Sequence, residues 1–368
     1  MKIGARTLKT GIAVFIAISI PILLGFPQVA DLAGISAVYS LQPSVKKSYG
    51  MVKERLLANT LGGLIAVFMT LTIGNTIFHI ALAAAVLIAL LHQMKLDNVI
   101  GLAAVTLIVI MLTDQSSIIG DSVLRVLATF VGVGVTFLVN TLVLPPKYES
   151  RLLTKIEHTT DELTKYTRTS LRKNSQYPIL KQDLQWVKKE ISEMERLLSL
   201  LIDQKSFLQL KKHPSLLRDA VVYRQFIKVT KSAFLLTSTL HKAENVYNHF
   251  PQDTRIIIRE RIETLMSAHE QILMKFTGRI LPDEVNFIAY KASLRKTFMN
   301  TFFSEASLDD YLKGDYGQSN TVIHLMSTIL LYEEALQHLN KLVRSYTKHH
   351  VDTDVLHTQH KKEARSAD

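Results

Sequence analysis

The segment Arg55-Leu-Leu-Ala-Asn-Thr-Leu-Gly62 returns 70 residues later as Arg125-Val-Leu-Ala-Thr-Phe-Val-Gly132. Both copies fit the pattern R-x-L-A-[NT]-x-x-G, and each lies at the start of a long apolar run. A second match precedes them, because Gly34-Ile-Ser-Ala-Val38 resembles Gly101-Leu-Ala-Ala-Val105 at an offset of 67 residues. These matches predict that the first three apolar runs of the chain are duplicated in the next three.

Apolar residues gather in six runs before Lys147. The third and sixth runs are long enough to cross a bilayer, which takes about 20 residues of helix, and the second is the shortest. A run below that length can instead be a buried or re-entrant segment. The six runs are Thr10–Leu24, Val29–Leu41, Leu56–Ile73, Ile77–Leu91, Val99–Leu112 and Val123–Leu144.

The basic residues favour six crossings. If the N-terminus is cytoplasmic and every run crosses, nearly all Lys and Arg residues of this half lie inside, as the positive-inside rule expects. If the second run did not cross, the cluster from Lys46 to Arg55 would lie outside. We therefore predict a multi-pass plasma-membrane protein with both termini in the cytoplasm. The inside residues are then Lys2, Arg6, Lys9, Lys46, Lys47, Lys53, Arg55, Lys95, Lys147, Arg151 and Lys155.

Three crossings are an odd number, so the two copies would have opposite orientations in the membrane. Inverted repeats of this kind are typical of secondary transporters, whose binding sites lie between the repeats. The small residues have a second interpretation that is compatible with transport. Ala58 with Gly62, and Ala128 with Gly132, are spaced to form helix-packing faces, because small residues let helix backbones approach closely.

Polar residues within or beside these runs are candidates for a substrate pathway, because polar groups in hydrocarbon tend to face protein or water. An arginine at each mouth, Arg55 and Arg125, favours an anion, since a guanidinium pairs with a carboxylate through two hydrogen bonds. Each arginine can alternatively be an interfacial anchor. The remaining pathway candidates are Tyr39, Gln42, Asn59, Thr60, Thr129 and Asn140.

The chain changes character at Lys147. Of its 15 glycines, 12 precede this residue, whereas 34 of the basic and 27 of the acidic residues lie from it onward. Apolar residues there recur at alternating spacings of four and three, which predicts amphipathic helices packed in a cytoplasmic bundle. The predicted domains are a transmembrane domain (1–146), an all-helical domain (147–350) and a disordered polar tail (351–368). The predicted helices of the second domain are Lys147–Lys173, Pro178–Lys212, Pro214–Asn248, Asp253–Gly278, Pro282–Lys313 and Ser319–His350, the last capped by Ser319.

Motifs of enzymes are missing from the sequence, so we predict no catalytic residue, no cofactor and no metal site. The chain has no cysteine, no phosphate-binding loop and no H-E-x-x-H pair. The net charge of +11 is small for 368 residues, and basic residues mostly alternate with acidic ones, so we predict no nucleic-acid partner. His269 lies on an apolar stripe and is predicted to be a core histidine rather than a sensor.

The combination of Gln42-Pro43-Ser44, the two R-x-L-A motifs and Asn140 resembles the aromatic acid exporter family, which is related to fusaric acid resistance proteins. The resemblance extends over essentially the whole chain. It implies six transmembrane helices followed by a helical cytoplasmic domain, and export of aromatic or other organic acids. Larger exporters of the family carry two membrane halves, so the resemblance implies a homodimer that supplies the second half.

Two other functions remain open from the sequence. The chain can be a non-transporting scaffold or sensor whose cytoplasmic bundle recruits a partner. It can also be an organic-anion channel, which differs from an exporter mainly in kinetics. The duplicated triplets and the paired arginines favour transport over a scaffold.

Overall fold

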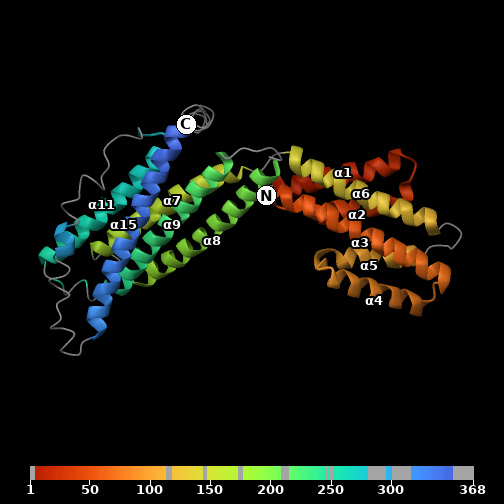
Figure 1. Cartoon of the computed structure of the whole chain (residues 1–368), viewed down its shortest axis with the longest axis horizontal. Coiled ribbons are helices and arrows are strands. Elements are labelled where there is room, and N and C mark those ends of the chain that lie inside the picture. The colour runs from red at the N-terminus through yellow and green to blue at the C-terminus, as the bar shows by residue number, and fades with distance from the viewer. Residues whose placement is uncertain are drawn as a thin grey trace. The chain divides into compact units, whose positions relative to one another are not determined.

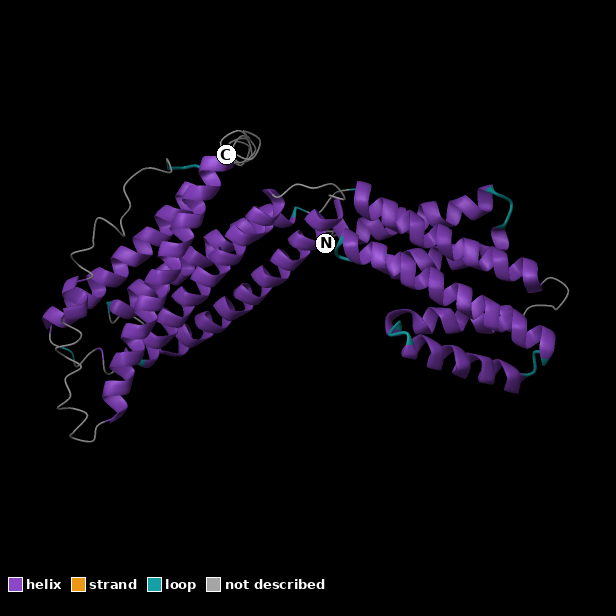
Figure 2. Cartoon of the chain, viewed as in Figure 1, coloured by secondary structure: helices purple, strands orange, loops and turns teal. Residues whose placement is uncertain are grey.

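The computed structural model is helical in both halves of the chain, and no strand occurs in the residues that it describes (Figure 2). These are residues 5–112, 118–143, 147–172, 177–208, 215–244, 247, 250, 252–280, 296–300 and 316–350. Contacts divide the chain into two compact units. Unit 1 comprises Met1–Pro146 with Asp203–Leu210, and unit 2 comprises Lys147–Ile202 with Lys211–Asp368.

Unit 1 contains the same order of elements twice: a helix, a 3₁₀ turn, a short helix and a long helix. Three of its helices are long and apolar enough to cross a membrane, over Arg6–Leu23, Val45–Thr72 and Ile119–Leu142. The first copy is α1 (Ala5–Leu23), η1 (Pro27–Val29), α2 (Ala30–Ser40) and α3 (Val45–Thr72). The second copy is α4 (Ile77–Gln93), η2 (Asp97–Val99), α5 (Ile100–Met111) and α6 (Ile118–Leu142).

Helices α1 and α4 end in the same turn. The second residue after each helical end has a left-handed backbone, with φ of +85° at Gly25 and +60° at Lys95. In both turns two amide groups donate back to the last carbonyls of the helix, as in a Schellman cap. These bonds run from Gly25 to Ile22 and Phe26 to Pro21 after α1, and from Lys95 to His92 and Leu96 to Leu91 after α4.

The short helix of each copy packs on the long helix of the other copy. Helix α2 contacts α1 and α6 far more than α3, while α5 contacts α3 and α4 far more than α6 (Figure 1). One apolar core therefore joins α1, α2 and α6, and a second joins α3, α4 and α5. Ala128 is buried in the first of these cores and Ala58 in the second.

The two glycines of the R-x-L-A motifs lie at these exchanged contacts. A Cβ atom on Gly132 would come within 2.2 Å of the Ala33 carbonyl oxygen, and one on Gly62 within 3.3 Å of the Ala103 carbonyl oxygen. Ala33 and Ala103 are also 70 residues apart. The structure therefore aligns the short helices at an offset of 70, not at the 67 that matching letters in the sequence indicated.

We expect Gly132→Ala to destabilise unit 1 strongly and Gly62→Ala to change its stability little. The alanine methyl group at 132 meets backbone, which moves only if α2 and α6 separate, and overpacking of this kind costs about 1–3 kcal/mol. At 62 the contact is tight but not prohibitive, and alanine gains roughly 0.5–1 kcal/mol over glycine within a helix. Size-exclusion chromatography of the purified protein after heating measures the difference. Equal thermal tolerance of the two variants would contradict this packing.

Unit 2 is a bundle around one large apolar core. Helix α9 packs against α7 and α15, and α11 packs against both of these. Its helices are α7 (Tyr148–Leu171), α8 (Tyr177–Leu208), α9 (Ser215–Lys242), α11 (Gln252–Phe276) and α15 (Tyr316–His350). The end of α8 from Asp203 onward belongs to unit 1. These bounds lie close to those predicted, but α15 starts three residues earlier, so Ser319 is inside the helix and does not cap it. The helix predicted over 282–313 lies outside the described residues except for 296–300, and so does the tail.

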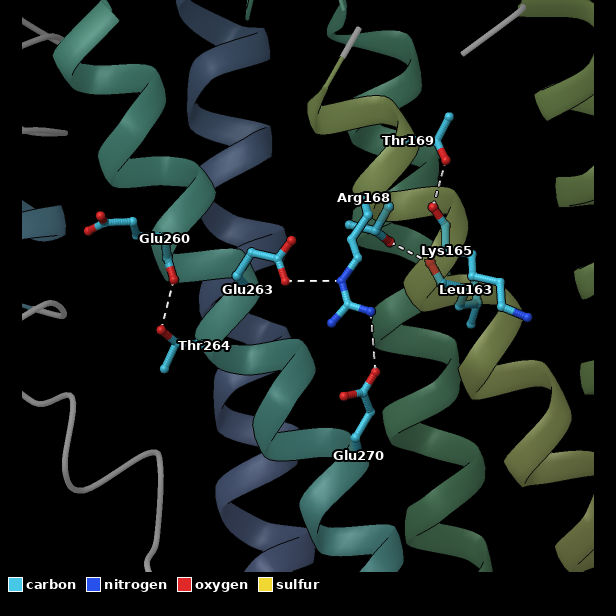
Figure 3. A network of polar contacts seen from close by, with 9 residues as sticks. Leu163, Lys165, Arg168, Thr169, Glu260, Glu263, Thr264 and Glu270 are labelled. Atoms are coloured by element: carbon cyan, nitrogen blue, oxygen red, sulfur yellow. Dashed lines mark hydrogen bonds and ion pairs between the residues drawn. The ribbon is translucent and has the colours of Figure 1, made fainter. Parts of the chain in front are cut away.

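Polar contacts join the helices of the bundle. Figure 3 shows Arg168 of α7 reaching two carboxylates of α11, with Nε 3.1 Å from Glu263 and Nη1 3.6 Å from Glu270. His269 is buried and its Nδ1 lies 3.0 Å from the Tyr332 hydroxyl, so it belongs to the core as predicted. Burial lowers the pKa of His269 to about 3, which keeps the imidazole neutral.

Candidate functional site

Arg55 lies in α3 and is almost completely enclosed, with 3% of its surface exposed. Its Nη1 donates to the Ser36 carbonyl oxygen and to the Ser40 hydroxyl, both at 3.0 Å. Both acceptors belong to the last turns of α2, where the helix dipole favours a cation. Arg55 therefore ties α3 to the short helix of its own copy, which it otherwise hardly touches.

No carboxylate forms an ion pair with Arg55 among the residues that the structure describes. Its Nε is also buried and has no acceptor in that part of the chain. A buried charge is costly unless it is paired, and the carbonyl and hydroxyl that it contacts carry no net charge. The guanidinium thus retains the capacity to pair with an anion.

A second cation is buried near the start of α1. Lys9 is 6% exposed, and its Nζ lies 3.3 Å from both the backbone oxygen and the side-chain oxygen of Asn140. The Asn140 amide donates in turn to the Gln42 carbonyl at 3.0 Å and to the Ser48 hydroxyl at 2.8 Å. The start of α1, the start of α3 and the end of α6 therefore meet at one end of unit 1.

These two groups of contacts lie along one face of α3. Ser48 and Arg55 are seven residues apart, which is two helical turns or about 10.5 Å. We call Lys9, Ser36, Ser40, Ser48, Arg55 and Asn140 the polar cluster. It contains two buried cations and no acid. The sequence patterns missed Lys9 and the three serines as members of a site, although the basic start of the chain and the serine spacing of four residues were visible.

Arg125 occupies the position in α6 that corresponds to Arg55 but has different surroundings. It is half-buried, and its buried Nε has no acceptor within the described part of the chain. The residues equivalent to Ser36 and Ser40 are Thr106 and Ile110, and isoleucine offers no side-chain acceptor. The repeat thus places one arginine in the polar cluster and leaves the other outside it.

The remaining predicted pathway residues divide into three groups. Asn140 is the centre of the polar cluster, and Gln42 contributes its backbone carbonyl. Asn59 and Thr129 are buried at corresponding positions of α3 and α6. Tyr39 and Thr60 are exposed. From the predicted set, the structure therefore joins Gln42 and Asn140 by a hydrogen bond and places Arg55 two turns further along the same face of α3.

Long apolar helices that pack around buried polar groups define a class, the helical membrane proteins. Known proteins agree with this class. A sequence model of aromatic acid exporter family member 1 matches residues 1–143. The UPF0421 protein YgaE of Bacillus subtilis (strain 168) is 30% identical over 354 residues, which cover 95% of this chain and 97% of the relative.

Other relatives match over shorter stretches. The UPF0421 protein OB2406 of Oceanobacillus iheyensis is 31% identical over 163 residues, 44% of this chain and 46% of its own length. The UPF0421 protein SAUSA300_1870 of Staphylococcus aureus (strain USA300) is 30% identical over 158 residues, 43% and 48% of the two chains. The chain belongs to the aromatic acid exporter family, among the members named UPF0421, and this membership indicates a membrane transporter.

Proposed function

We propose that this protein is an exporter, not an enzyme, and that it moves organic carboxylate anions, aromatic acids among them, out of the cell across the plasma membrane. The observation that carries the proposal is Arg55, a buried guanidinium without a carboxylate partner in the described residues. A carboxylate substrate would supply the missing charge and accept two hydrogen bonds in the plane of the guanidinium. Lys9 of α1 is a second buried cation, linked through Asn140 to the same face of α3, and it adds to the attraction for an anion.

The proposed topology has six crossings in two inverted triplets, with both termini in the cytoplasm. Contacts within unit 1 support a topology in which successive helices end at opposite ends of the unit. The Lys9, Gln42 and Asn140 contacts gather the chain start, the turn before α3 and the end of α6 at one end. The Asn75 amide donates to the Met111 carbonyl at 3.4 Å, so α3 and α5 end together at the other.

The short helices support a site between the triplets. Helices α2 and α5 have 11 and 12 residues, so each is about 17–18 Å long, shorter than the roughly 30 Å hydrocarbon core of a bilayer. Interrupted helices at corresponding positions of two halves mark the binding site in many secondary transporters. Arg55 bonds to the end of one of them, α2, which is where an inverted-repeat transporter would hold its substrate.

Unit 2 is proposed to lie in the cytoplasm and to serve dimerisation or gating. A homodimer would bring two copies of unit 1 together, as the single membrane half in this chain requires. The proposal leaves a carrier and a channel as alternatives. A channel with the same selectivity would instead pass anions passively down their gradient, and the flux experiment below distinguishes the two.

The proposed function is tested by efflux from membrane vesicles that contain the purified protein. We expect benzoate and related aromatic carboxylates to leave protein-containing vesicles faster than empty ones, while the neutral analogue benzamide leaves both at equal rates. Saturation with increasing benzoate indicates a carrier, and linear dependence indicates a channel. No difference between full and empty vesicles for any acid of a broad carboxylate panel would contradict transport and favour a scaffold.

A further inference from the structure

A pocket of about 210 Å³ lies in unit 2, at the junction of the end of α7 with the first turns of α11. It is distant in sequence from the polar cluster of unit 1 and shares no residue with it. Two arginines, one glutamine, one tyrosine and two aliphatic residues form its wall. These are Leu171, Tyr247, Gln252, Arg255, Ile256 and Arg259.

The arginines of the pocket lack carboxylate partners among the described residues. Arg255 and Arg259 are one turn apart on α11, and neither forms an ion pair with any described carboxylate, while the Nε of Arg255 is buried without an acceptor there. The described acids nearest to the pocket in the sequence are Glu244 and Asp253, and neither forms an ion pair with these arginines. By contrast, Arg168 contacts two carboxylates of this same helix, as seen in Figure 3.

Like charges at this spacing repel each other on a helix, by a few tenths of a kcal/mol. They also lie in the first two turns of α11, where free backbone N–H groups and the helix dipole add positive potential. The Tyr247 hydroxyl donates to the Arg255 carbonyl at 3.3 Å, which holds the aromatic ring against this turn. The pocket thus combines concentrated positive charge with a fixed aromatic wall.

The other walls are apolar. Leu171 closes the end of α7, and the tyrosine and Ile256 provide a further apolar surface beside the guanidinium groups. An inorganic anion would leave these surfaces without a partner. A ligand with a carboxylate at one end and a small apolar body at the other fits both. The volume lies below the roughly 300–1,000 Å³ of sites for drug-sized ligands, which limits the body to about one ring.

We propose that this pocket is a binding site for a small organic carboxylate, held by Arg255 and Arg259 and covered by Tyr247, Leu171 and Ile256. Unit 2 then carries a ligand site of its own, separate from the transport path. The inference does not rest on transport, because binding at this pocket is measured without flux. It gives the second unit a role in sensing the concentration of an acid.

Isothermal titration of the full-length protein in detergent tests the site, with benzoate as the probe, and with benzamide and inorganic phosphate as comparisons. We expect the double variant Arg255→Gln with Arg259→Gln, made in an Arg55→Gln background so that the proposed site of unit 1 does not contribute, to bind benzoate about tenfold more weakly or worse than Arg55→Gln alone, because it loses two charge-assisted contacts. Arg224→Gln, which changes an exposed arginine of α9 outside the pocket, is the matched control and should bind like the unchanged protein.

A further variant separates this site from unit 1. Arg55→Gln should retain benzoate binding in unit 2, whatever its effect on flux. The proposal is overturned if the unchanged protein does not bind benzoate at millimolar concentration, if the double variant binds it normally, or if only Arg55→Gln loses binding. Benzamide or phosphate binding as tightly as benzoate would also overturn it. Unchanged fluorescence of Trp186 verifies that the double variant is folded.

Discussion

Arg55→Ala is expected to reduce benzoate efflux by about ten- to a hundredfold, and Arg125→Ala to leave most of it. A charge-assisted hydrogen bond is worth roughly 1.5–3 kcal/mol, and the loss of Arg55 removes the cation that would hold the carboxylate inside unit 1. Arg125 has the same sequence context but lies outside the polar cluster. Initial rates of benzoate efflux from vesicles with equal amounts of incorporated protein measure both effects.

Two further variants show whether Arg55 acts by charge or by geometry. Arg55→Lys keeps the charge but cannot bond both Ser36 and an anion through a planar fork, so we expect intermediate flux. Ser40→Ala removes one acceptor that orients the guanidinium and should lower flux less than Arg55→Ala. Monodispersity in size-exclusion chromatography checks that unit 1 stays folded. Full flux in Arg55→Ala would remove this residue from the mechanism.

The contrast between the two arginines illustrates what the sequence could predict. The R-x-L-A motifs indicated a duplication, and the structure places them in α3 and α6, the long helices of the two copies. They could not distinguish the environments of the two side chains. Arg55 is enclosed because α2 presents Ser36 and Ser40 to it, and the equivalent face of α5 presents Thr106 and Ile110 instead.

Contacts between distant parts of the chain were equally beyond local patterns. Asn140 was a candidate as a polar residue in an apolar run, but its contact with Lys9 spans 131 positions. In the sequence, Lys9 is one of several basic residues that indicate a cytoplasmic N-terminus. Only the packing of α1 against α6 shows that its side chain is buried. The packing of each short helix on the long helix of the other copy also depends on tertiary contacts. It is visible in the structure but not in the repeated sequence.

In unit 2 the periodic spacing of apolar residues predicted the helices well, because each buries a continuous stripe. Phe226, Val229 and Leu236 of α9 are all buried. Most charged residues between the stripes are exposed or half-buried. Lys275 and Asp219 are buried exceptions. So are Arg261 and Glu333, which are 1% and 3% exposed and face each other between α11 and α15.

Glu333→Ala is expected to destabilise unit 2 by about 3–5 kcal/mol, because it leaves the Arg261 guanidinium buried without its partner. The two groups lie 2.5 Å apart, and the Nε and Nη1 of Arg261 have no other acceptor among the described residues. Trp186 is the only tryptophan of the chain and packs against the core of unit 2, so its fluorescence during denaturant unfolding reports on this unit.

A matched exposed pair and an apolar replacement complete the test. Glu195→Ala breaks an ion pair with Lys231 whose side chains are half exposed, which should cost about 0–1 kcal/mol. Replacing both buried partners, Arg261→Met with Glu333→Leu, should restore most of the stability lost in Glu333→Ala, because desolvating two charges offsets much of their attraction. If Glu333→Ala costs no more than Glu195→Ala, water or a neighbouring group already compensates Arg261. The buried pair would then specify how α11 and α15 align without stabilising the bundle.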